Sequence, residues 1–166
     1  MPLSRNSARR SSSKPSPKFT LDQLTHSDTA EKHGIDNRPA PGHLSNLKRL
    51  ALLLEAIQTL LRHPVTVTSA YRNPEVNRLV GGVPASKHAL GLAADIVCPA
   101  FGSTLDVARA IAASGIRFDQ VIHEYGRWVH VGMAVEGISP RRQLLTICSK
   151  EAGYLDGLHP CNTSDA

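Results

Sequence analysis

Ser86-Lys87-His88-Ala89-Leu90-Gly91-Leu92-Ala93-Ala94-Asp95 is the stretch from which the rest of the chain can be interpreted. Gly91 lets the chain turn after His88, because glycine adopts backbone conformations that other residues avoid. Residues 92–97 form a short apolar run, typical of a buried strand, with one carboxylate inside it. A buried carboxylate is costly unless it is paired, hydrogen-bonded or bound to a metal. Asp95 is therefore expected to have a partner.

The size and composition of the chain indicate one globular domain. Its 166 residues are 41% hydrophobic, which is enough for a core without disulfides. The formal net charge is +5, but a group of basic residues precedes the folded region, and without them the balance is near zero. A body with so little net charge gives no reason to expect a nucleic-acid partner. The basic residues in question are Arg5, Arg9, Arg10, Lys14 and Lys18.

The two ends of the chain differ from its middle. Residues 1–18 contain Ser, Arg, Lys and Pro but almost no apolar side chains, so we predict a disordered basic tail. Residues 19–148 are predicted to form the folded domain, and the polar residues 149–166 a loosely ordered tail. The N-terminus lacks the apolar segment of a secretory signal, and no stretch reaches the roughly 18 apolar residues of a membrane span. These features predict synthesis as a cytoplasmic protein.

The cysteines do not form a metal-binding or redox motif. Cys98, Cys148 and Cys161 are far apart, with no CxxC pair among them. An odd number of dispersed cysteines is typical of reduced thiols. A bridge between Cys148 and Cys161, formed after release from the cytoplasm, stays open.

Hydrophobic periodicity predicts the framework of the domain. Residues 43–62 carry leucine and isoleucine at three- and four-residue spacing and form the strongest predicted helix. Shorter helices are predicted for residues 74–80 and 104–114, and strands for residues 65–70, 92–97, 120–125, 128–135 and 142–148. We therefore predict a single α+β domain whose helices pack on a small antiparallel sheet, with a cleft on the exposed sheet face.

Two histidines and Asp95 meet the requirements of a zinc site. Catalytic zinc usually takes three protein ligands and leaves one position for water. His88, Asp95 and His130 supply such a set, and their metal-binding atoms are then expected to lie roughly 3–4 Å apart. Glu124, six residues before His130, is the candidate general base, because a carboxylate beside the metal can accept a proton from water.

The position of Glu124 requires a particular hairpin. Trp128 and His130 share one face of their predicted strand. A two-residue turn at Gly126-Arg127 would place Glu124 on the opposite face. A three-residue loop over residues 126–128, or a bulge, would set Glu124 across from His130.

His123 is a weaker candidate. His123-Glu124 resembles the start of the helical HExxH zinc motif, but Arg127 stands where the second histidine would be. On a strand His123 points away from Glu124. We therefore interpret His123 as a structural histidine.

Together these segments resemble a known family. Ser86-x-His88-x-x-Gly91-x-Ala93-x-Asp95, followed by Glu124 and Trp128-x-His130, resembles the zinc D-alanyl-D-alanine carboxypeptidase family, which includes vancomycin-resistance dipeptidases and phage endolysins. The resemblance runs from about residue 19 to residue 148. It also takes in residues 68–72, Asn77 and Gly81-Gly82, and it implies a hedgehog/DD-peptidase-like fold.

The resemblance implies a role for several residues. His88, Asp95 and His130 match the family's zinc ligands, and Glu124 matches its catalytic base. Arg72 matches an arginine that holds substrate or stabilises the developing oxyanion, a task that suits a guanidinium. The alternative for Arg72 is a surface ion pair with Glu75.

Three further residues are expected to support the site or line the substrate cleft. Ser86 is expected to help fix Asp95 or His88 by a hydrogen bond. Trp128 is expected to pack against the site. Asp119 either supports a ligand histidine or is an ordinary turn carboxylate.

The implied activity is zinc-dependent hydrolysis of a peptide bond at a D-amino acid in peptidoglycan stem peptides. Whether the enzyme is a carboxypeptidase or an endolysin-type endopeptidase stays open. The missing export signal favours a phage or prophage product that acts as a monomer on the cell wall after release. The alternatives are a non-catalytic peptidoglycan-binding or phage structural module that retains the metal, and a structural zinc protein with His123 as fourth ligand.

Overall fold

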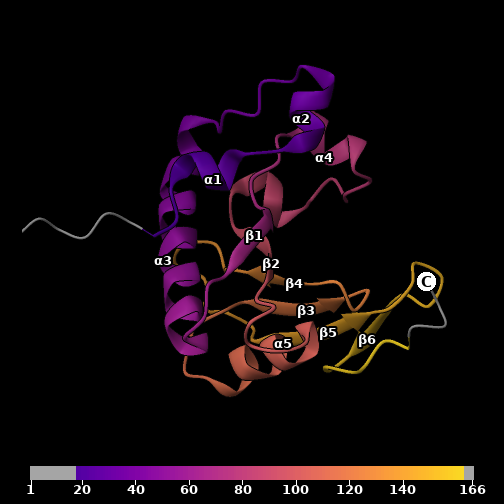
Figure 1. Ribbon diagram of the computed structural model, residues 1–166. Coiled ribbons are helices and arrows are strands. Elements are labelled where there is room, and N and C mark those ends of the chain that lie inside the picture. Colours follow the sequence, from indigo (N-terminus) through magenta and orange to yellow (C-terminus); the bar gives the residue numbers. More distant parts are fainter. Residues whose placement is uncertain (1–17, 163–166) are drawn as a thin grey trace, which may run out of the picture.

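The computed structural model describes residues 18–162 (Figure 1). Except for Lys18, the tail predicted for residues 1–18 lies outside the described residues, as do residues 163–166. The α-helices are α1 (Leu21–Thr25), α2 (Asp28–His33), α3 (Leu44–Leu61), α4 (Pro74–Leu79) and α5 (Thr104–Ala113). The strands are β1 (Thr66–Ser69), β2 (Ala93–Val97), β3 (Gln120–Glu124), β4 (Trp128–Gly132), β5 (Gln143–Ile147) and β6 (Tyr154–Asp156). Two 3₁₀ turns, η1 (Pro41–His43) and η2 (Lys87–Leu90), complete the elements.

The predicted α+β fold is confirmed, but the sheet is not entirely antiparallel. Its strand order is β1-β2-β4-β3-β5-β6, and β5 runs parallel to β3 while every other neighbouring pair is antiparallel. Strand β4 ends at Gly132, which lies beside Gln120, the first residue of β3. Residues 133–142 then cross to the other side of β3, where β5 begins at Gln143, again beside Gln120. Alternation within a strand carries no information on the direction of its neighbour, which is why the parallel pair was not predicted.

Helices α3 and α5 cover one face of the sheet (Figure 1). The apolar stripe predicted for residues 43–62 is buried along α3, where Leu50, Leu54 and Ile57 have no exposed surface. It packs in one core with sheet residues such as Ile96 and Val129. The neighbours of these sheet residues, Asp95 and His130, point to the opposite face because side chains alternate along a strand. The sheet therefore separates the apolar core from the polar site.

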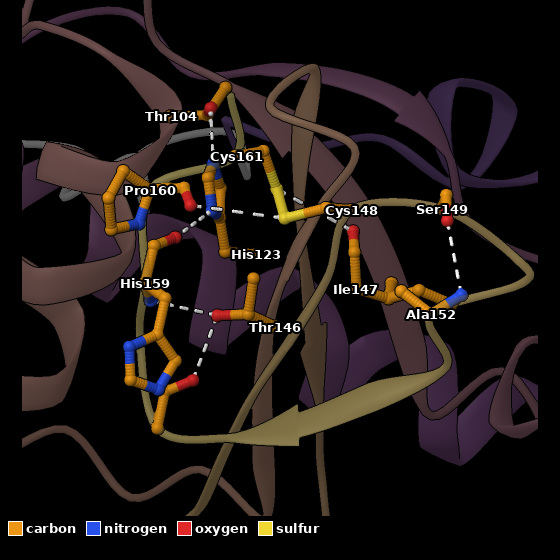
Figure 2. Close-up of a disulfide and its surroundings, with 11 residues drawn as sticks. Thr104, His123, Thr146, Ile147, Cys148, Ser149, Ala152, His159, Pro160 and Cys161 are labelled. Atoms are coloured by element: carbon orange, nitrogen blue, oxygen red, sulfur yellow. Dashed lines mark hydrogen bonds between the residues drawn. A yellow bond between two sulfur atoms is a disulfide. The ribbon is translucent and has the colours of Figure 1, made fainter. Parts of the chain in front are cut away.

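The C-terminal segment is held to the sheet rather than loosely ordered as predicted. Strand β6 pairs with β5, and Cys148 is disulfide-bonded to Cys161 (Figure 2). Thr146 Oγ1 donates a hydrogen bond to the carbonyl of Gly157 (2.8 Å) and accepts one from the backbone N–H of His159 (2.9 Å). The groups that hold residues 149–162 belong largely to other parts of the sheet. The polar composition of the segment therefore gave no indication that it is ordered.

The disulfide also answers the question that the cysteine spacing left open. It joins two residues that are 13 positions apart, and a cross-link of this span stabilises the folded state by about 3 kcal/mol because it restricts the unfolded chain. Cys98 is free and buried. None of the helices between residues 18 and 162 combines the length and the apolar character needed to cross a bilayer.

Candidate metal centre

The three predicted zinc ligands come from separate elements and meet on the exposed face of the sheet. Asp95 on β2 lies directly opposite His130 on β4 in the antiparallel ladder, and such a pair brings the two Cβ atoms to about 5 Å. His88 comes from η2, the 3₁₀ turn that precedes β2. All three residues are buried.

The ligand atoms lie at the predicted spacing. His88 Nε2 is 3.1 Å from His130 Nδ1, His130 Nδ1 is 3.1 Å from Asp95 Oδ1, and His88 Nε2 is 3.3 Å from Asp95 Oδ1. Two imidazole nitrogens and one carboxylate oxygen, each with a lone pair, suit a zinc ion with a fourth position left for water. Among residues 18–162 this is the only buried group of this kind. The donor set therefore fits the ion.

The orientation of His88 is set by its other ring nitrogen. His88 Nδ1 donates a hydrogen bond to the carbonyl of Ala70 (2.6 Å), so the lone pair on Nε2 faces Asp95 and His130. Ser86 caps the turn that carries His88, because its Oγ accepts from the backbone N–H of His88 (3.3 Å). The contact predicted for Ser86 is therefore made through the backbone of a ligand residue.

The charge on Asp95 depends on the two histidines. Burial raises the pKa of this carboxyl, but the two facing histidines, His88 before His130, outweigh burial and hold the pKa well below its usual range. Asp95 is therefore an ionised, buried carboxylate. Such a group needs hydrogen bonds, a charged partner or a metal ion, and a metal bound by His88, Asp95 and His130 would meet this need.

Glu124 lies on the predicted face of the sheet but in a different register. It pairs with Trp128, while Ile122 pairs with His130. The loop spans residues 125–127 instead of 126–128, and Tyr125 and Gly126 both have positive φ. The shift amounts to two residues, which leaves every side chain on the same face.

Trp128 contacts Glu124 directly. The indole Nε1 donates a hydrogen bond to Glu124 Oε2 at 2.7 Å. Burial raises the pKa of Glu124, and the charge of Asp95 raises it further, while His130, Trp128 and Arg72 act in the opposite direction. The net pKa of Glu124 is raised. The packing role predicted for Trp128 thus includes a hydrogen bond that the sequence did not indicate.

Arg72 lines the same cleft. Burial lowers its pKa, and the charges of Asp95 and Glu124 oppose this effect. Its Nε is buried without a hydrogen-bond partner, and no ion pair with Glu75 is present among residues 18–162. The guanidinium is therefore available to a ligand in the cleft.

Asp119 does not contact a ligand histidine. Its buried carboxylate pairs with Lys87 and with Arg141, whose Nη2 lies 2.7 Å from Asp119 Oδ2. The hydrogen bonds from Arg141 and Lys87 hold the pKa of Asp119 well below its usual range. Lys87, to which the sequence assigned no role, also donates to the carbonyl of Met133 (2.7 Å). Asp119 is therefore neither a support for a candidate ligand histidine nor an ordinary turn carboxylate, because it forms buried ion pairs with Lys87 and Arg141.

His123 lies on the opposite face of the sheet, as predicted. Its Nδ1 donates to the carbonyl of His159 (2.9 Å), and its Nε2 accepts from Thr104 Oγ1 (3.0 Å; Figure 2). Both ring nitrogens are thereby occupied. His123 does not belong to the buried group of metal-binding residues and does not supply a fourth ligand.

Asn77 and Gly82 shape the rim of the cleft. Asn77 Nδ2 donates to the carbonyl of Val83 (2.8 Å), which bends the loop around the amide. A Cβ atom at Gly82 would lie 2.2 Å from Asn77 Oδ1, so no other residue fits without movement. This packing accounts for the asparagine and the glycine in the quoted pattern.

The resulting cleft has a volume of about 1010 Å³. His88, Asp95, His130 and Glu124 are among its lining residues. A possible metal site, a carboxylate of raised pKa and an unpaired guanidinium in one cleft are the components of a metallopeptidase.

The comparison with known families agrees with this class. A model of the family described as Peptidase M15 matches residues 17–132, more than half of the chain. The chain therefore belongs to the M15 family of metallopeptidases, the zinc D-Ala-D-Ala carboxypeptidase family. Peptidases of this family depend on zinc. No curated protein is significantly similar to the chain.

Proposed function

We propose that the protein is a zinc-dependent peptidase that hydrolyses a peptide bond at a D-amino acid in peptidoglycan stem peptides. The observation that carries the proposal is the convergence of three buried ligand atoms, 3.1–3.3 Å apart, in a cleft that also contains Glu124. Membership of the M15 family supports the same activity. The D,D-carboxypeptidase and the endolysin-type endopeptidase are the two forms that it can take.

The residues that would hold the zinc ion are His88, Asp95 and His130. When bound there, zinc would polarise the scissile carbonyl and make a water molecule more acidic. The pKa of the buried Asp95 carboxyl is lowered, which favours its negative charge, and the bond from His88 to Ala70 orients Nε2 toward Asp95 and His130.

Glu124 would accept the proton of the attacking water and return it to the leaving amine. A general base works best when its pKa lies near the working pH, and burial moves the pKa of Glu124 in that direction. The hydrogen bond from Trp128 is made to Glu124 Oε2, and no hydrogen bond within residues 18–162 engages Oε1, which can therefore face the water. Arg72 would hold a carboxylate or the developing oxyanion of the substrate, because its guanidinium has no ion-pair partner among residues 18–162.

Trp128→Phe is expected to shift the acidic limb of the pH profile to higher pH. The indole N–H stabilises the charged form of Glu124, so its removal raises the pKa of this carboxyl further. Because the base acts when deprotonated, activity is present above its pKa and is lost as the pH falls through it. The measurement is kcat/KM of the wild-type and variant proteins between pH 4 and pH 9, a range chosen around the ordinary pKa of glutamate. A variant whose acidic limb coincides with that of the wild type contradicts the coupling.

We further propose that the protein acts on the cell wall after release from the cytoplasm, as a phage or prophage product. The disulfide between Cys148 and Cys161 supports action outside the reducing cytoplasm, where such bonds persist.

The experiment is digestion of purified peptidoglycan and of defined muropeptides, with mass analysis of the products. The zinc-loaded protein is expected to release fragments whose masses identify the bond that is cut. A chelator is expected to abolish release, and added zinc to restore it. Binding to peptidoglycan without any fragment would identify the non-catalytic module instead.

A further inference from the structure

The C-terminal segment supplies one wall of the cleft, although it lies beyond the family match, which ends at residue 132. Ser149, Lys150, Tyr154 and Asn162 line the cleft together with both cysteines of the disulfide. These residues do not belong to the zinc-binding pattern, and nothing above assigns them a role.

Tyr154 is aligned with the candidate general base. In the sheet, Tyr154 pairs with Ile147, Ile147 pairs with Glu124, and Glu124 pairs with Trp128. Side chains of directly paired residues point to the same face. Tyr154 therefore lies on the face that carries the site, two strands from Glu124, or about 10 Å between the backbones.

The hydroxyl of Tyr154 is a free donor. None of the hydrogen bonds of residues 18–162 engages it, and the residue, which is 60% exposed, lines the cleft. Partial burial raises the pKa of this hydroxyl, and the negative charge of Glu124 adds to the effect. The hydroxyl is therefore able to donate a hydrogen bond to a ligand in the cleft.

The backbone that carries Tyr154 is held in place from both sides. Before β6, the N–H of Ala152 donates to Ser149 Oγ (3.1 Å); after β6, the chain is fixed by Thr146 and by the disulfide (Figure 2). The disulfide joins the end of β5 to residue 161, so β6 lies inside a closed loop. A donor on such a loop loses little freedom when it binds a ligand.

We propose that Tyr154 is a substrate-contacting residue, and that its hydroxyl, positioned by the disulfide-closed loop, donates a hydrogen bond to a carbonyl or carboxylate oxygen of the stem peptide. The inference rests on the proposed function and deepens it, because it assigns part of the peptide recognition to residues outside the zinc-binding pattern.

Tyr154→Phe tests the proposal with the removal of one oxygen atom. On the soluble muropeptide that the wild type cuts, kcat/KM is expected to fall about tenfold, the effect of one well-placed hydrogen bond. Zinc content and melting temperature are expected to stay unchanged. Leu155→Ala is the control, because Leu155 pairs with Thr146 and faces away from the cleft; its kcat/KM is expected to stay within about twofold of wild type.

Two results would overturn the proposal: an unchanged kcat/KM in Tyr154→Phe, or an equal loss in Leu155→Ala. The wild-type protein separates this failure from that of the proposed function. If zinc-loaded wild type cuts no muropeptide, the proposed function fails. Calorimetric binding of a defined soluble muropeptide then decides the role of Tyr154, because about tenfold weaker binding by Tyr154→Phe supports the contact and equal binding rules it out.

The role of the disulfide is tested by removing Cys148 and Cys161 together. In the Cys148→Ser/Cys161→Ser background, Tyr154→Phe is expected to lose much less than tenfold, because the hydroxyl is no longer held over the cleft. The full tenfold loss in both backgrounds would show that the disulfide does not position Tyr154.

Discussion

Glu124→Gln is expected to lower the turnover of stem peptides by about 10²–10⁴-fold, the usual contribution of a general base. Zinc content is expected to stay near one ion per chain, because Glu124 is not one of the three buried ligand residues. Glutamine keeps the size of the side chain and can still accept the hydrogen bond that Trp128 donates to Oε2. The variant therefore removes the proton acceptor and leaves the cleft intact.

The measurement is steady-state hydrolysis of a defined muropeptide, with metal analysis of the same protein samples. Glu136→Gln is a matched control, since Glu136 is exposed and does not line the cleft. Near-normal hydrolysis by zinc-loaded Glu124→Gln would remove Glu124 from the mechanism. Loss of zinc from the variant would instead identify Glu124 as a ligand.

His130→Ala is expected to lose both zinc and activity. His130 Nδ1 lies 3.1 Å from both His88 Nε2 and Asp95 Oδ1, so its removal takes away the nitrogen shared by both contacts. Two remaining ligands hold the ion poorly. Turnover is expected to fall to the level of the chelated wild type, which is a larger loss than that of Glu124→Gln.

Metal analysis after gel filtration, together with the melting temperature, separates loss of zinc from loss of folding. His33→Ala provides the comparison, because His33 is exposed at the end of α2 and is expected to keep both zinc and turnover. A folded His130→Ala protein that retains one zinc per chain would contradict the proposed ligand set.

The placement of Glu124 shows how far sequence reasoning can go. The alternation of Trp128 and His130 predicted the face on which the carboxylate must lie, and the structure confirms this face. The loop that achieves it could not be predicted. Tyr125 adopts a positive φ that is uncommon for a residue other than glycine. In addition, the expected pairing of Glu124 with His130 and the observed pairing with Trp128 differ by two residues and leave Glu124 on the same face, so the hydrophobic pattern does not distinguish them.

The local elements and the residue types of the site could be predicted from patterns within the amino-acid sequence. Helix α3, the strand around Asp95 and the alternation that carries His130 each depend on neighbours within a few residues, and such patterns are visible in the chain. The chemistry of a buried carboxylate predicted that Asp95 has a partner, and the resemblance to the family indicated that His88 and His130 lie beside it.

The contacts between segments that are distant in the chain could not be predicted from local patterns and are seen only in the tertiary structure. These include the parallel pairing of β3 with β5, the ion pairs of Asp119 with Lys87 and Arg141, and the attachment of residues 157–159 to Thr146 and His123. Each contact depends on strand order, and strand order results from the packing of the whole domain rather than from any local propensity. A polar segment such as residues 157–159 becomes ordered because its backbone forms hydrogen bonds with buried groups. Without these partners, the entropy lost on ordering would not be offset.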